Sequence, residues 1–125
     1  MFGTLSQVAL GGALGAVARF GTQTLAFRLF GPTIPVGTLA ANVLGSFLMG
    51  LAAAWLIDRE FARFAPLVIV GFLGAYTTFS TYALDALKLW ERGEPVLAFG
   101  YVIGSVVLSI GACLAGLGLG RSMMA

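Results

Sequence analysis

The chain has 125 residues, of which 59% are apolar and 10% are charged, and it contains one cysteine and no histidine. A soluble domain carries about 25% charged residues and a disordered segment far fewer apolar ones, so both classes are excluded. The lone cysteine excludes a disulfide framework, and without histidine there is no Ser-His-Asp triad and no zinc site of His and Cys. The seven basic residues are scattered, unlike those of a protein that binds nucleic acid. An all-α integral membrane protein remains.

Charged and turn-forming residues divide the chain into four apolar stretches, each long enough to form a membrane-spanning helix of about 20 residues. We predict spans at about 4–27, 34–57, 64–87 and 96–120, within one transmembrane domain at 1–125. The connectors are marked by Gly31-Pro32, by the charged run around Asp58-Arg59, and by Gly93.

With four spans, both termini lie on one side of the membrane. Three basic residues then lie on the side of the termini, Arg59, Arg63 and Arg121. Three lie on the other side, Arg28, Lys88 and Arg92, or four if Arg19 is counted. The difference is zero or one, so the positive-inside rule gives almost no preference for one orientation. We predict that the chain inserts in both orientations and forms an antiparallel, dual-topology homodimer. The alternative is that something other than this charge count sets one orientation.

Arg19 is the one charged residue deep within the first span. A charge in lipid is costly, so an arginine at this position indicates a specific role for its side chain. It either reaches the membrane interface along its apolar stem or attracts an anion at the mouth of a pore.

Two spans carry a stripe of polar residues on one helix face. Their members are spaced four residues apart: Thr38, Asn42 and Ser46 in the second span, and Tyr101, Ser105 and Ser109 in the fourth. Ser and Thr commonly hold membrane helices together, so helix packing is one explanation. The other is a polar track, which Asn42 favours because its amide is costly in lipid and offers two N–H donors.

The third span has an unusual centre, with glycines followed by a run of hydroxyl and aromatic residues up to Tyr82. This composition has poor helix propensity, and Ser and Thr hydroxyls can replace lost helical bonds. We predict a break in mid-membrane between about Gly74 and Thr78, whose freed carbonyls could coordinate a cation. The alternative is an unbroken helix that uses its small residues for packing.

The first, second and fourth spans lack an acidic residue near mid-membrane. A proton-coupled exporter of drugs or guanidinium needs a carboxylate there, which argues against that class. Hydroxyls, an amide and the positive edges of aromatic rings suit an anion instead. A membrane protein that only packs against others would not explain the Thr-Thr-Phe-Ser-Thr-Tyr run at 77–82.

Three motifs occur in order: GGALGAVARF at 11–20, GTLAANVLGSF at 37–47 and GFLGAYTTFSTY at 71–82. Together they resemble the Fluc/CrcB family of bacterial fluoride ion channels, and the length and number of spans agree. The resemblance implies a non-enzymatic, passive and fluoride-selective channel in the lipid of the bacterial inner membrane, which exports fluoride from the cytoplasm. It implies two antiparallel pores per homodimer. It also implies a central structural Na+, not transported, held by backbone carbonyls of Gly74 and Thr77 from both subunits.

The resemblance assigns the pore residues position by position. By motif they are Asn42, Phe79, Ser80, Thr81 and Tyr82, joined by the stripe residues Thr38, Tyr101, Ser105 and Ser109, with Arg19 at the vestibule. Tyr82 stands where relatives more often carry Phe, which leaves the role of its hydroxyl open. Asn42 is expected to donate its amide to fluoride.

Overall fold

The computed structural model describes residues 1–57 and 60–124. Two residues of the predicted second connector, Asp58 and Arg59, lie outside the described residues, as does Ala125. The described part contains helices and no strands. In chain order they are α1 (Phe2–Phe30), α2 (Val36–Leu56), the 3-10 helix η1 (Glu60–Phe64), the π-helix η2 (Pro66–Leu73), the short α3 (Gly74–Tyr76), α4 (Ser80–Glu91) and α5 (Pro95–Met123).

Glycine and proline mark several of the helix ends. Gly31 ends α1 and Gly93 follows α4, with φ of 77° and 78°, a conformation that favours glycine at helix ends. Pro66 and Pro95 stand at the first turn of η2 and α5, where a missing N–H removes no helical bond. Because α4 continues to Glu91, it ends four residues beyond the predicted boundary at residue 87.

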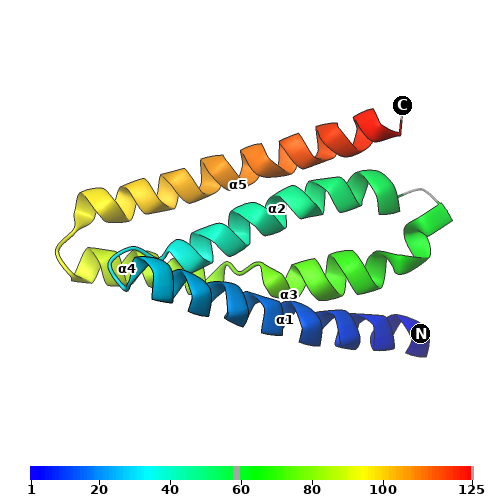
Figure 1. The fold of residues 1–125 in the computed structure, drawn as a ribbon, viewed down its shortest axis with the longest axis horizontal. Helices are drawn as coiled ribbons and strands as arrows, with labels where there is room; N and C mark the ends of the chain where they lie inside the picture. Colours follow the sequence, from blue (N-terminus) through cyan, green and yellow to red (C-terminus); the bar gives the residue numbers. More distant parts are fainter. Residues whose placement is uncertain (58–59, 125) are drawn as a thin grey trace.

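The helices lie side by side along one long axis (Figure 1). The α2 helix lies along α5, and α1 lies along η2 and α3. The start of α1 and the end of α5 are at the same end of the bundle (Figure 1). This arrangement brings α2, the connection between α3 and α4, and α5 to one region of the molecule.

Three segments of the described chain are long and apolar enough to span a membrane: Val36–Leu56, Pro66–Glu91 and Pro95–Met123. They correspond to the second, third and fourth predicted spans. The α1 helix covers the first predicted span and is about 43 Å long at 1.5 Å per residue. It is less apolar than the others because it contains Arg19, Arg28 and Gln23. Its membrane crossing stays a prediction.

Glycines allow the helices to approach closely. Gly50 of α2 lies against the carbonyl oxygen of Cys113, and Gly116 of α5 lies against that of Phe47, so neither position has room for a Cβ atom. The same kind of contact brings α1 against η2. Small residues at helix contacts are typical of membrane proteins, in which close packing must replace the hydrophobic effect.

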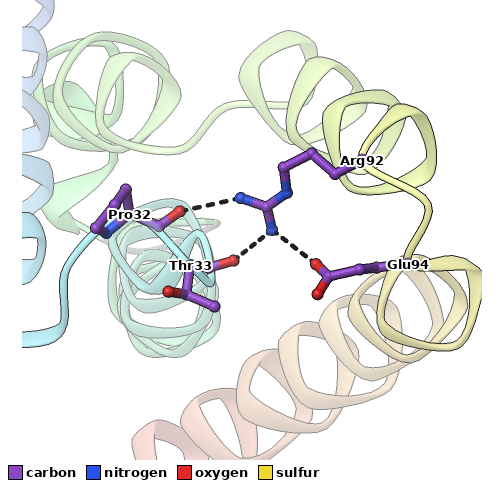
Figure 2. Close-up of polar contacts among 4 residues, drawn as sticks. All are labelled: Pro32, Thr33, Arg92 and Glu94. Atoms are coloured by element: carbon purple, nitrogen blue, oxygen red, sulfur yellow. Dashed lines mark hydrogen bonds and ion pairs between the residues drawn. The ribbon is translucent and has the colours of Figure 1, made fainter.

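One arginine joins two connections at the end of the bundle opposite the termini. Figure 2 shows the guanidinium of Arg92 donating to the carbonyl oxygens of Pro32 (3.4 Å) and Thr33 (2.6 Å), and to a carboxylate oxygen of Glu94 (3.0 Å). These contacts tie the α1–α2 connection to the α4–α5 connection. The ion pair is exposed, so we expect it to contribute at most about 1 kcal/mol.

Candidate functional site

The site is organised by an interruption between α3 and α4. The α3 helix ends at Tyr76, Thr77 is extended (φ −86°, ψ 158°), and α4 begins at Ser80. Gly74 has helical dihedral angles (φ −60°, ψ −36°). The non-helical residues are therefore 77–79, at the end of the stretch in which the sequence predicts a break and just beyond it.

The carboxamide of Asn42 on α2 is paired with the backbone of Thr78 inside this interruption. The Thr78 N–H donates to Asn42 Oδ1 (2.8 Å), and Asn42 Nδ2 donates to the Thr78 carbonyl (2.9 Å). One side chain thus satisfies both main-chain groups of a residue that has left the helix. Such groups must find partners when they are away from water. Thr78 is absent from the predicted site residues, and the hydroxyl run at 77–81 was the signal that could have indicated it.

Two carbonyl groups are released as a result. In a continuous helix, the Thr78 N–H would bond to the carbonyl of Gly74, and the Thr81 N–H to that of Thr77. Here the Thr78 N–H donates to Asn42, and the Thr81 N–H donates to Thr78 Oγ1 (3.2 Å). Carbonyl oxygens freed in this way are ligands that hard cations prefer. The backbone at Gly74 and Thr77 therefore fits a small hard cation.

A groove of about 480 Å³ lies beside the interruption, between α2, α4 and α5. Its lining includes seven of the predicted site residues: Asn42, Gly74, Thr77, Phe79, Tyr82, Ser105 and Ser109. Ser46, Thr78 and Cys113 are among the others. None of the described residues that line it carries a charge. The groove is therefore uncharged, and its amide and hydroxyl groups lie among apolar side chains such as Met49, Val106 and Ile110.

The other predicted site residues lie elsewhere. Thr38 and Thr81 line a second cavity of about 340 Å³ together with Asp85, Lys88 and Arg92. Tyr101 is buried, and its hydroxyl donates to a carboxylate oxygen of Asp85 (3.3 Å). Ser80 is exposed at the start of α4, and the partly exposed Arg19 lines neither of these two cavities.

Ser105 has a hydroxyl without a partner. Its side chain is buried, with 4% of the residue exposed, and within the described residues Oγ makes no hydrogen bond. A buried polar group left in this state costs about 1–3 kcal/mol. Because Ser105 lines the groove, this donor is available to a polar ligand there.

Three aromatic rings are in contact in sequence, from Phe79 and Tyr82 in the groove lining to Tyr101 outside it. The Phe79 ring meets the Tyr82 ring edge-on, with centroids 5.5 Å apart, and Tyr82 lies 5.3 Å from Tyr101. Phe79 is 78% exposed, whereas Tyr82 is buried between α4 and α5 in a cluster with Leu89 and Ala98. Ring edges carry the positive part of the aromatic quadrupole and can contact an anion.

Comparison with known proteins shows which family the chain resembles. Residues 6–117 match the family described as CrcB-like protein, Camphor Resistance (CrcB). The chain is 54% identical over 122 residues to the fluoride-specific ion channel FluC of Paracoccus denitrificans, with 98% of each chain covered. It is 50% identical to FluC of Cereibacter sphaeroides over the full length of both chains. It is 47% identical to FluC of Rhizobium etli, with 94% of this chain and 95% of the relative covered.

These relatives are named as ion channels and not as enzymes, and the three apolar helices fit a multi-pass protein of the bacterial inner membrane. Because the match extends over almost the whole chain, this chain belongs to the CrcB family.

Proposed function

We propose that this chain is a fluoride-selective, passive ion channel that exports fluoride from the cytoplasm and so lowers its toxicity. The observation that carries the proposal is the uncharged groove lined by amide, hydroxyl and ring-edge donors, among them the unpartnered hydroxyl of Ser105. The names of the relatives support the choice of fluoride.

Fluoride is small and holds its water tightly, so a conducting path must replace that hydration with several hydrogen-bond donors. Asn42, Ser105 and Ser109 supply such donors in the groove, and the edges of Phe79 and Tyr82 supplement them. A fixed positive charge in the groove would bind the ion more tightly and slow its release. A negative-inside membrane potential favours outward movement by about 2.3 kcal/mol per 100 mV.

The working unit in this proposal is an antiparallel homodimer, with four spans per chain, a third helix broken in mid-membrane, and two pores. The groove is open on one side, and 78% of Phe79 is exposed there. In a membrane the amide and hydroxyl groups of the groove must be covered, and a second copy covers them without leaving polar groups in lipid. The nearly equal numbers of basic residues on the two sides allow the two copies to insert in opposite orientations.

The proposed dimer holds one structural sodium ion, through the carbonyl groups of Gly74 and Thr77 in each chain. Both carbonyls are released from helical hydrogen bonds by the contacts of Thr78 and Thr81. When bound, the ion supplies a positive charge close to the anion path. The pore roles of Thr38, Ser80, Thr81 and Tyr101, and the vestibule role of Arg19, stay predictions.

The proposal is tested by passive efflux from liposomes that contain the purified protein. They are loaded with potassium fluoride or with potassium chloride, valinomycin is added, and the external anion is followed with an electrode. We expect rapid fluoride release and no chloride release above that of protein-free liposomes. Equal release of both anions would exclude selectivity. No release from well-folded protein would favour the alternative in which the polar stripes only pack helices.

A further inference from the structure

We infer that Asn42 is a positioning residue for the structural cation, because its carboxamide keeps the interruption between α3 and α4 open. The inference rests on the proposed function, in which the carbonyls of Gly74 and Thr77 hold sodium. It assigns Asn42 a second task beside its expected contact with fluoride. It also brings Thr78, which no motif assigns to the site, into the same mechanism.

The first step is the competition for the Thr78 N–H. This group can bond either to the carbonyl of Gly74, which closes the helix, or to Asn42 Oδ1, as the structure has it at 2.8 Å. The second bond of the pair, from Asn42 Nδ2 to the Thr78 carbonyl at 2.9 Å, fixes the peptide on both sides. While the pair exists, the Gly74 carbonyl cannot receive its usual helical donor.

In the second step, another side chain takes a backbone N–H away from its helical acceptor, one turn further along the chain. Thr78 Oγ1 accepts the Thr81 N–H at 3.2 Å, as Ser and Thr side chains do at helix starts. The Thr81 N–H is thereby withheld from the carbonyl of Thr77. Two side-chain contacts thus release two carbonyls three residues apart, and both depend on the position of the Thr78 peptide.

The residue type at position 42 follows from this geometry. The pair requires one acceptor and one donor on the same planar group, which a carboxamide provides. A carboxylate accepts from the Thr78 N–H but meets the Thr78 carbonyl with a second acceptor, and an alanine makes neither bond. The amide of Asn42 has a second hydrogen, and Asn42 lines the groove, so holding Thr78 leaves a donor for an anion.

The test measures sodium binding through stability and is independent of fluoride flux. The purified protein in detergent is heated at a series of sodium chloride concentrations, with N-methylglucamine chloride holding the ionic strength constant. The sodium concentration that gives half of the maximal thermal stabilisation is the readout. We expect Asn42→Ala to raise it about tenfold, since two hydrogen bonds that hold the site open are lost.

A matched control and a second pair of variants keep the result interpretable. Ser46→Ala changes a residue one turn further along α2 that lines the same groove, and its sodium midpoint should stay within about twofold of the wild type. Thr78→Ala removes the acceptor for the Thr81 N–H and should raise the midpoint. Thr78→Ser retains that acceptor, so its sodium midpoint should equal that of the wild type.

Three results would overturn the inference. Equal midpoints for Asn42→Ala and Ser46→Ala would mean that Asn42 does not position the cation site, while the site itself would stand. If Asn42→Ala does not fold, equal midpoints for Thr78→Ala and Thr78→Ser would have the same meaning. A wild-type protein indifferent to sodium would overturn both the inference and the proposed cation site. The liposome measurement would still decide separately whether the chain conducts fluoride.

Discussion

The hydroxyl of Tyr82 on α4 donates a hydrogen bond of 2.8 Å to the main-chain carbonyl of Val102 on α5. Position 82 is the one at which the sequence departs from the phenylalanine more common in the family it resembles. The hydroxyl is occupied by α5, and the ring stays beside Phe79. The tyrosine thus holds two helices together and leaves its ring edge for the groove.

Tyr82→Phe is therefore expected to preserve fluoride flux within about threefold while lowering the free energy of unfolding by about 0.5–1.5 kcal/mol. The reason is that only the bond to Val102 is lost. Flux from liposomes and thermal unfolding in detergent measure the two effects. A large loss of flux at unchanged stability would mean that the hydroxyl itself contacts the ion.

Phe79→Ile is expected to reduce fluoride flux at least about tenfold, because an aliphatic side chain has no positive ring edge. Since 78% of Phe79 is exposed in the single chain, its replacement should lower stability by less than about 1.5 kcal/mol. Phe20→Ile on α1, where the phenylalanine is 71% exposed, is the matched control and should conduct normally. Normal flux in Phe79→Ile would remove this ring from the mechanism.

Ser105→Ala tests whether Ser105 serves fluoride conduction or helix packing. Because the Ser105 hydroxyl has no partner within the described residues, its removal should leave stability unchanged or raise it by up to about 1 kcal/mol. Fluoride flux should fall about tenfold if that donor replaces one hydrogen bond of hydration worth about 1.4 kcal/mol. Destabilisation with unchanged flux is the result that would identify Ser105 as a packing residue instead.

Gly116→Ala tests the contact between α2 and α5. An added Cβ would meet the carbonyl of Phe47, so the helices must move apart, at a cost of about 1–3 kcal/mol. Gly118→Ala faces open space on the same helix and should be neutral or stabilising by up to about 1 kcal/mol. Similar unfolding temperatures for the two variants would show that close α2–α5 packing is not required.

Local patterns were sufficient to predict most of the helices. Long apolar stretches bounded by glycine, proline and charge predicted the segments that became α2, η2 to α4, and α5. The first span was predicted in the same way, but the polar residues of α1 lower its hydropathy, and α1 is not among the three segments of the described chain that are apolar enough to span a membrane. The π-helical form of η2 was not predicted, because its composition is that of any apolar helix.

Side-chain spacing predicted shared faces but not partners. The stripe Thr38, Asn42 and Ser46 was expected to line one track, yet Thr38 lines the second cavity while the other two line the groove. Likewise Tyr101 is paired with Asp85, whereas Ser105 and Ser109 line the groove. A face of a helix more than two turns long can meet different neighbours along its length, and spacing does not reveal them.

The sequence by itself determined the class of protein, because its apolar content leaves no soluble alternative and its helix-breaking residues mark the ends of the segments. It also determined which polar groups enter the apolar interior. Only the tertiary structure decided how those groups are used: Asn42 holds Thr78, Tyr82 holds Val102, and Ser105 is left with a free donor. The physical reason is that each of these hydrogen bonds joins two different segments of the chain, and its formation depends on how closely those segments pack.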